Sequence, residues 1–208
     1  MARSQAELPP RRMADSMDSA SIPLGSDPQL RDRSSILAIT LPRYLTVGGG
    51  VRIGRILEDM DIFAVHLVFK HVSNPRQGPG LASPLSIVTA MVDSIDFTRP
   101  LRSPAPHTIS TGPTVTSACL ATCPGLEAPL LRWPRFGPSN LQTPLQVSLE
   151  LEQEVEGVWL RCTEATFVMV ARDPLNKTAN FVNPLKVVTK EEQEVFNRGI
   201  ENKTRCVD

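Results

Sequence analysis

The stretch from Gly54 to His71 lacks proline and any further glycine, and its apolar residues recur at the spacing of an α-helix. One face of the helix that this spacing predicts is apolar and comprises Ile53, Ile56, Leu57, Met60, Phe63, Ala64, Leu67 and Val68. A face this broad is typical of a helix that packs against a sheet. The segment therefore predicts one long central helix that the rest of the chain has to cover.

The charged residues of this helix fall into two groups. Arg55, Asp59, His66 and Lys70 gather on the side opposite the apolar face, and we expect them to stay in water. Asp61 instead lies within the apolar stripe, where a carboxylate is costly unless it has a partner. The pattern leaves two interpretations open. Asp61 is either a structural carboxylate paired with a neighbouring amide or base, or a general base in a catalytic site.

Three consecutive glycines, Gly48 to Gly50, lead into the helix. The Gly-Lys-Ser/Thr sequence that would complete a phosphate-binding loop does not follow them. One interpretation is a flexible turn. The other is a close approach of a ligand to the helix N-terminus, where backbone N–H groups near Gly50 and Gly54 would stabilise developing negative charge, as in an oxyanion hole.

Composition narrows the class of protein. At 208 residues the chain is long enough for one domain with a core, and its 22 basic residues equal its 22 acidic ones, so we expect no nucleic-acid partner. We also expect no membrane span and no secretory signal. Cys119 and Cys123 have the spacing of half a zinc site, but no second pair completes it. We therefore expect an intracellular protein without a bound metal or cofactor.

The remaining chain divides by composition. Residues 1–43 mix charges, prolines and serines and predict a largely disordered tail, followed by a single domain over 44–208. One or two strands are predicted over 85–97, and a pair of strands at 150–156 and 158–172 around a turn at Glu156-Gly157. Thr189 and Glu192 form a capping box that opens a helix. Residues 98–148 hold nine of the 19 prolines, and there we expect an irregular segment without an ordinary strand or helix.

Several blocks together resemble a known family. RIGRILEDMDIFAV, SPLSIVTAMVDSID, EATFVMVARD, and FVNPL followed by TKEEQEVFNRGIENK resemble the acyl-coenzyme A thioesterases of the hotdog superfamily, in particular the mitochondrial acyl-CoA thioesterase 9 type. The resemblance covers roughly 7–33, 44–97 and 149–205. It implies an α+β hotdog fold, in which an antiparallel sheet wraps around one long central helix.

The resemblance also implies an activity and partners. Members of this family hydrolyse acyl-CoA to a free fatty acid and coenzyme A without a cofactor. They usually carry two hotdog domains, with active sites where paired hotdogs meet, so we expect a homo-oligomer formed by hotdog pairing. The implied location is the mitochondrion. Because residues 1–43 are too acidic for a transit peptide, the cytoplasm is the alternative.

The resemblance assigns candidate roles to residues. Asp61 stands where many hotdog thioesterases place an acidic residue, and it would activate water or attack the thioester directly. Amides at Gly54 and Gly50 would polarise the thioester carbonyl. His71 matches a histidine common at this helix end and is either catalytic or a cation that stabilises the helix C-terminus. Glu58 is a second acidic candidate.

The chain departs from the family in three places. It accounts for about one hotdog, residues 34–43 interrupt a family block, and the pattern Ser-Gly-His-Val-Ser-Trp-Val-Gly is absent from 98–148. Codons for residues 115–133 can be chosen so that a one-base shift spells that pattern. We hypothesise a frame-shifted or mis-spliced family strand, which the coding DNA tests, and a sheet that has lost this strand. The alternative function is therefore an inactive hotdog remnant that binds acyl-CoA or a partner hotdog subunit.

Overall fold

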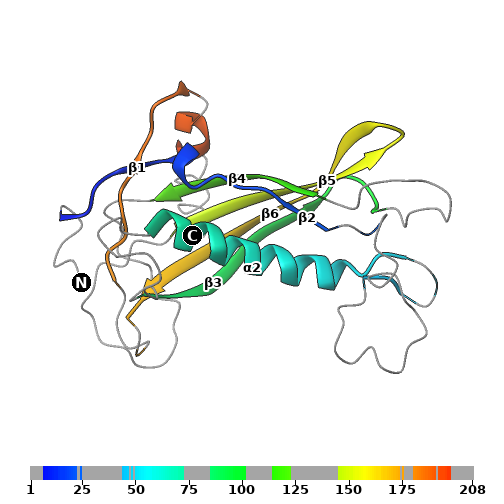
Figure 1. The fold of residues 1–208 in the computed structure, drawn as a ribbon, viewed down its shortest axis with the longest axis horizontal. Coiled ribbons are helices and arrows are strands. Elements are labelled where there is room, and N and C mark those ends of the chain that lie inside the picture. The colour runs from blue at the N-terminus through cyan, green and yellow to red at the C-terminus, as the bar shows by residue number, and fades with distance from the viewer. Residues whose placement is uncertain are drawn as a thin grey trace, which may run out of the picture.

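The computed structural model describes residues 7–22, 24, 44–46, 48, 50–72, 85–101, 145–173, 175, 180–190 and 192–197, and the backbone of 114–122. Five strands form an antiparallel sheet in the order β2-β4-β5-β6-β3, and the long helix α2 lies across it (Figure 1). The elements in chain order are β1 (Arg11–Arg12), η2 (Met13–Asp15), β2 (Ala20–Ser21), α2 (Ile53–Val72), β3 (Ser86–Phe97), β4 (Thr114–Thr122), β5 (Leu145–Val155), β6 (Val158–Arg172) and β7 (Leu185–Lys186).

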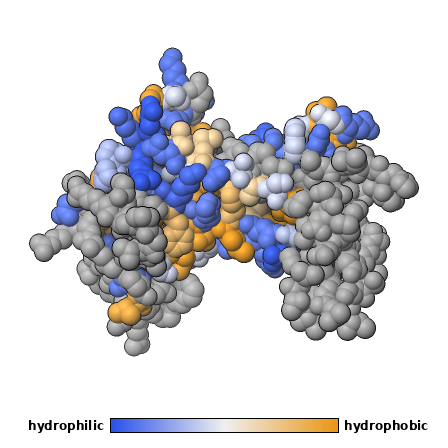
Figure 2. Space-filling view, viewed as in Figure 1, coloured by the Kyte–Doolittle hydropathy of each residue, from blue (hydrophilic) through white to orange (hydrophobic). Residues whose placement is uncertain are grey.

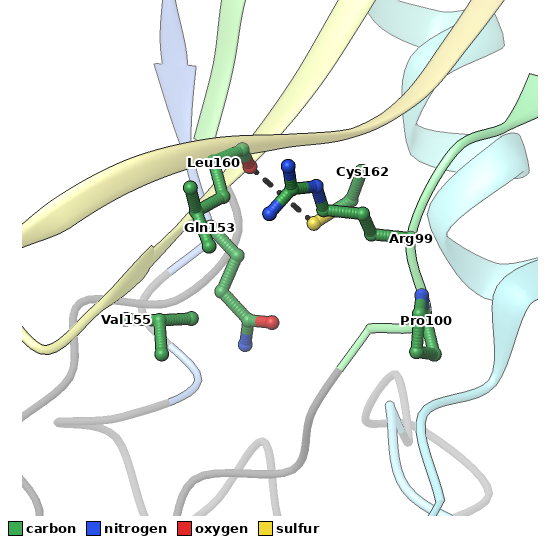
Figure 3. A pocket seen from close by; sticks show the side chains of 6 residues that line it. All are labelled: Arg99, Pro100, Gln153, Val155, Leu160 and Cys162. Carbon is green, nitrogen blue, oxygen red and sulfur yellow. Dashed lines mark hydrogen bonds between the residues drawn. The ribbon is translucent and has the colours of Figure 1, made fainter.

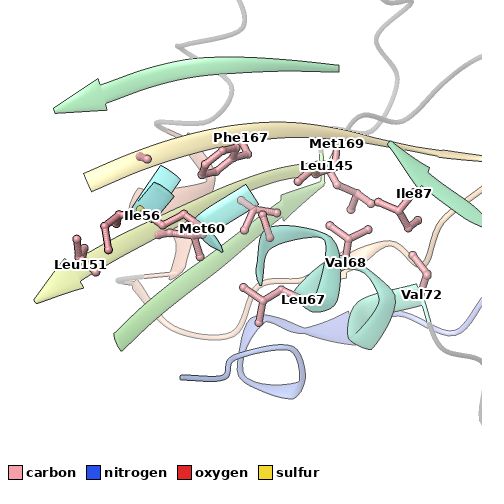
Figure 4. Close-up of a cluster of buried hydrophobic side chains, with 14 of the residues drawn as sticks. Ile56, Met60, Leu67, Val68, Val72, Ile87, Leu145, Leu151, Phe167 and Met169 are labelled. Carbon is pink, nitrogen blue, oxygen red and sulfur yellow. The ribbon is translucent and has the colours of Figure 1, made fainter. Parts of the chain in front are cut away.

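The helix α2 buries the apolar face that the sequence predicts. Its buried apolar residues recur at the spacing of one helical face. They are Ile56, Met60, Ala64, Leu67, Val68 and Val72. Figure 4 shows Ile56 and Met60 near Leu151 of the sheet, and Val68 and Val72 near Ile87. The predicted central helix over 54–71 is therefore confirmed, and one residue at each end extends it.

The sheet side of the core comes mainly from the hairpin of β5 and β6. Inward residues alternate with outward ones along β5, and the buried set on the two strands includes Leu145, Val147, Leu149, Leu151, Phe167 and Met169. The turn between them has positive φ at Glu156 (53°) and Gly157 (79°). Positive φ at both central residues is the pattern of a type I′ hairpin turn. The predicted strand pair and its turn are confirmed, and β5 begins earlier, at Leu145.

Strand β3 confirms the predicted strand over 85–97 and pairs with β6 alone among the described strands. Its register against β6 shifts between Thr89 and Met91 and again between Val92 and Ser94. Bulges of this kind are common on edge strands. The far half of β3 exposes Val92, Ile95 and Phe97, which is unusual for large apolar side chains on a single strand.

Strand β4 corrects two expectations for the proline-rich segment. Residues 114–122 form a strand that pairs with β5 along its length, so the segment does contain an ordinary strand and the sheet has no missing place there. The physical reason is that this stretch is free of proline and holds three threonines and one valine, while Pro113 and Pro124 lie just outside it. His107, Cys123 and the rest of 102–113 and 123–144 lie outside the described residues.

The N-terminal segment differs from the disordered tail that its composition predicts. Strand β1 pairs in parallel with β7, and β2 pairs with β4. Met13, Ile22 and Leu24 are buried. These anchors are too few and too irregularly spaced to produce a periodic signal, and their partners lie far along the chain. Residues 25–43, including the interruption at 34–43, lie outside the described residues.

Two further predictions concern helices. The Thr189 amide donates to Glu192 Oε2, and the Glu192 amide donates to Thr189 Oγ1, both at 3.2 Å, which confirms the capping box. Within the described part of the chain, no helix combines the length and apolar character that crossing a membrane requires.

The core makes a direct prediction about stability. Leu149 is fully buried on β5, so Leu149→Ala should lower the free energy of unfolding by about 2–5 kcal/mol. Leu175→Ala removes the same atoms from a residue that is 72% exposed, and it should change stability by no more than about 0.5 kcal/mol. Urea denaturation of both variants measures the difference, and equal losses would contradict this assignment of the core.

Candidate functional site

Asp61 and Thr89 meet between the helix and the edge strand. Thr89 Oγ1 donates to Asp61 Oδ1 at 2.6 Å, and the same hydroxyl lies 3.2 Å from Met169 Sδ on β6. Asp61 is half-buried, at the border of the apolar stripe rather than inside it. Its partner is therefore a hydroxyl from β3, not the backbone amide or basic side chain that a structural role predicted.

This pair leaves one carboxylate oxygen available for chemistry. The hydrogen bond from Thr89 fixes Oδ1, whereas Oδ2 of Asp61 has no hydrogen-bond partner among the described residues. A carboxylate that is oriented through one oxygen can accept a proton, or attack an electrophile, through the other. The geometry suits a general base or a nucleophile.

The glycine-rich turn places its two candidate amides differently. Leu45 and Val51 form an antiparallel bridge, and the Thr46 amide donates to the Gly50 carbonyl at 2.7 Å. The Gly50 amide donates to Thr46 Oγ1 at 3.0 Å, so it supports the turn and is not free to bind a carbonyl oxygen. Gly54 lies exposed in the first turn of α2, where backbone amides have no partner within the helix. Of these two glycines, Gly54 remains a candidate donor and Gly50 does not. Gly49 lies outside the described residues.

Glu58 does not join Asp61. Its side chain is 64% exposed and forms an ion pair with Arg55, three residues earlier on the helix. An exposed pair of this kind contributes little to stability. The structure therefore places the second acidic candidate on the solvent side of α2.

His71 has a different environment from either role expected for it. Its side chain is fully buried, its Nε2 lies 3.0 Å from the Asn183 carbonyl oxygen and its Nδ1 lies 2.9 Å from Ser16 Oγ. Because a carbonyl can only accept, Nε2 carries the proton and Nδ1 accepts from Ser16. Burial lowers the pKa of His71, and the Asn183 carbonyl opposes this more weakly. His71 is thus a neutral link between three chain segments.

Distance also separates His71 from the carboxylate. Ten residues of helix between Asp61 and His71 correspond to about 15 Å along the axis. The two side chains therefore cannot act on the same atom within one chain. No local pattern indicates that His71 links three segments, since Ser16 and Asn183 lie far from it along the chain.

Sequence reasoning also missed a group beside the glycine-rich turn. Tyr44 Oη donates to Asp59 Oδ2 at 2.6 Å, and Arg55 Nη2 donates to Asp59 Oδ1 at 2.8 Å. Burial, and then the Asp59 carboxylate, raise the pKa of Tyr44 to about 12. Asp59, expected in water, is therefore bound on both oxygens. The only available signal was that Tyr44 is the single tyrosine of the chain.

A pocket of about 230 Å³ lies apart from Asp61, near the end of the β5–β6 hairpin (Figure 3). Its lining residues are Arg99, Pro100, Gln153, Val155, Leu160 and Cys162. Cys162 Sγ donates to the Leu160 carbonyl at 3.4 Å, and burial raises the pKa of this thiol. Arg99 follows Thr89 by ten residues, or roughly 30 Å of extended chain. Among the described residues, no cluster of three histidine, cysteine or acidic side chains could hold a metal ion.

The surface in front of the helix is mixed in character. Figure 2 shows apolar residues in the middle of the face on which α2 lies, bordered by hydrophilic ones. On α2 itself Ile62, the residue after Asp61, is 63% exposed. An apolar side chain next to the candidate base is therefore open for contact.

Comparisons with known proteins find relatives in sequence and a shared fold in structure. No protein-family model matches the sequence. The chain is 38% identical over 205 residues, or 99% of its length, to mitochondrial acyl-coenzyme A thioesterase 9 of Mus musculus, and 37% identical over 207 residues to that of Homo sapiens. It spans 39% of the length of each relative.

Solved structures show the same architecture. An apo-hexameric acyl-CoA thioesterase superposes with a TM-score of 0.59 at 15% identity, with 95% of both chains covered. The acyl-CoA hydrolase from Staphylococcus aureus, solved with butyryl coenzyme A, coenzyme A and coenzyme A disulfide, superposes with a TM-score of 0.61 at 13% identity. That match covers 95% of this chain and 90% of the other.

The sheet wrapped around one long helix is the hotdog fold in the form found in acyl-CoA thioesterases, which confirms the predicted fold class. Within that class the chain is a homologue of the mitochondrial acyl-CoA thioesterase 9 proteins, and the family resemblance of its sequence is confirmed.

The buried histidine predicts how stability depends on pH. The folded chain holds His71 with a lowered pKa, so the unfolded chain binds more protons below the ordinary value of 6.5. The stability that neutral His71 contributes should be complete above about pH 6.5 and decline below it, by at most about 1.4 kcal/mol per pH unit. Urea denaturation at pH values from about 5 to about 8, spaced by about half a unit, measures this slope.

A variant pair isolates the effect. His71→Gln should be less stable at neutral pH but lose less stability on acidification than the natural chain. The control His66→Gln removes an imidazole that is 57% exposed, and it should keep the natural slope. An unchanged slope in His71→Gln would contradict the neutral, buried state.

Proposed function

We propose that this chain hydrolyses acyl-CoA to a free fatty acid and coenzyme A, with Asp61 as general base or nucleophile. The observation that carries the proposal is the Asp61–Thr89 hydrogen bond, which orients a half-buried carboxylate on the central helix of a hotdog fold. The relatives named acyl-CoA thioesterases, and the neighbour solved with butyryl coenzyme A, supply the substrate class.

The chemistry divides between two groups on α2. Asp61 Oδ2 removes a proton from water, and the resulting hydroxide adds to the thioester carbon while the C–S bond breaks and the coenzyme A thiolate leaves. In the covalent variant, Asp61 adds to that carbon itself and the C–S bond breaks, so that the coenzyme A thiolate leaves. Water then hydrolyses the resulting anhydride, which releases the fatty acid and restores the Asp61 carboxylate. The Gly54 amide stabilises the negative charge that develops on the carbonyl oxygen.

The spacing of these two groups requires a second hotdog. Asp61 and Gly54 lie seven residues apart on α2, which is about 10 Å along the axis. Both groups have to reach the same thioester within hydrogen-bond distance. One domain therefore contributes Asp61 and its partner contributes Gly54, so that the active unit is a pair of hotdogs, and we propose that a second copy of this chain provides the partner.

The names of the relatives support a location. Three relatives at 37–38% identity are named mitochondrial, and we propose the mitochondrion for this protein. Fluorescence microscopy of the tagged protein tests this, with a cytoplasmic distribution as the contrary result.

Replacing the proposed base should abolish most of the turnover. Asp61→Asn keeps the shape and the hydrogen bond from Thr89 but cannot accept a proton, so kcat should fall by at least about a hundredfold. Asp96→Asn on exposed β3 makes the same chemical change away from the site, and it should keep full activity. Turnover is measured as release of coenzyme A thiol from acyl-CoA of several chain lengths.

The outcomes separate the candidate functions. Turnover that survives in Asp61→Asn would remove this residue from the mechanism. Binding of acyl-CoA by the natural chain without hydrolysis would favour the alternative of an inactive remnant that binds acyl-CoA or a partner hotdog.

Mixing two inactive variants tests the shared site. Gly54→Pro lacks the donor N–H, so it and Asp61→Asn should each be inactive alone. Refolded together, they should regain about a quarter of natural activity, because a mixed pair has one site with both groups intact. A mixture that stays as inactive as its components would contradict a site built from two copies of this chain.

A further inference from the structure

We propose that Tyr44 is a positioning residue for thioester hydrolysis, which acts through Asp59 and Arg55 to hold the first turn of α2 in place. The inference rests on the proposed function, because it concerns how the Gly54 amide is aimed at the thioester carbonyl. None of the three side chains needs to touch the substrate.

The backbone around Gly54 depends on Tyr44 for its position. The Arg52 amide donates to the Tyr44 carbonyl at 2.7 Å, directly before α2 begins. The Arg52 carbonyl then accepts from the amides of Arg55 and Ile56, which flank the turn containing Gly54. The peptide groups on both sides of the proposed donor are therefore fixed to one residue pair, Tyr44 and Arg52.

The Tyr44 side chain adds a second attachment one turn further along the helix. Its ring is 6% exposed and belongs to the core, and its hydroxyl donates to Asp59 at 2.6 Å. Arg55 closes the group: it donates to the other Asp59 oxygen at 2.8 Å, and its guanidinium carbon lies 5.8 Å from the centre of the Tyr44 ring. Arg55 directly follows Gly54, so the closed group includes the neighbour of the proposed donor.

The hydrogen bond from Tyr44 to Asp59 matters because the backbone before α2 can adopt many conformations. Three glycines lie between Tyr44 and Arg52, and glycine restricts the backbone least of all residues. A transition-state donor has to hold its direction to within a fraction of an ångström, and misplacement by about 1 Å can cost a hundredfold in rate. A hydrogen bond from a buried hydroxyl to a carboxylate is strong enough to supply that restraint.

The experiment removes one oxygen atom. Tyr44→Phe keeps the buried ring and loses the hydrogen bond to Asp59, so kcat should fall by about tenfold to a hundredfold, while KM changes by less than about twofold. Ser16→Ala is the matched control, because it removes a hydroxyl that hydrogen-bonds to the opposite end of the same helix, at His71. It should lower thermal stability to a similar degree and leave kcat unchanged.

A second variant grades the effect. Asp59→Asn retains an oxygen for Tyr44 but loses the charge that binds Arg55, so its kcat should fall between those of the natural chain and Tyr44→Phe. This variant decides the question if Tyr44→Phe does not fold.

Each outcome bears on one of the two proposals or on both. If the natural chain is active and Ser16→Ala and Tyr44→Phe lose kcat equally, Tyr44 has only a structural role. That result would overturn this inference alone. An unchanged kcat in Tyr44→Phe would do the same. A natural chain without any thioesterase turnover would overturn the proposed function and this inference together.

Discussion

The packing of α2 on the hairpin of β5 and β6 is the interaction on which the rest of the structure depends. Met60, Ala64 and Leu67 on the helix are fully covered, as are Leu145 and Leu149 on the sheet. This contact fixes both the rotation of α2 and its height over the sheet, since shifting an apolar stripe by one residue would expose it. The direction in which Asp61 leaves the helix, toward Thr89 on β3, is a consequence of that rotation.

The same packing bears on the proposed division of the site between two hotdogs. Because α2 is one continuous helix from Ile53 to Val72, its N-terminal amides and the Asp61 carboxylate cannot approach each other. A hotdog that used both groups within one chain would need a broken helix, and breaking it would remove apolar contacts from the core. The proposed sharing of the site between two domains keeps the helix whole, and Ile62, the residue after Asp61, is exposed.

Sequence reasoning succeeded where the signal was local and periodic. The helix, the hairpin turn at Glu156-Gly157 and the capping box at Thr189 all follow from neighbouring residues. It failed where function depends on partners distant along the chain. The spacing placed Asp59 in water because Tyr44 was not known to cover it, and it could not tell that His71 faces Ser16 and Asn183. Thr89 fits the strand pattern of its segment, and nothing in that pattern indicates that it hydrogen-bonds to Asp61.

The packing of residues 11–24 against later parts of the chain has a consequence for folding during synthesis. Strand β1 needs β7 as its partner, and Ser16 bonds to a histidine whose other nitrogen needs the Asn183 carbonyl. These contacts span most of the chain, and contacts of such high sequence separation form late. Until the later strands have been synthesised, residues 11–24 lack their partners, and the apolar side chains of Met13 and Leu24 remain exposed. Residues 11–24 are therefore expected to be among the last described parts to reach their final position.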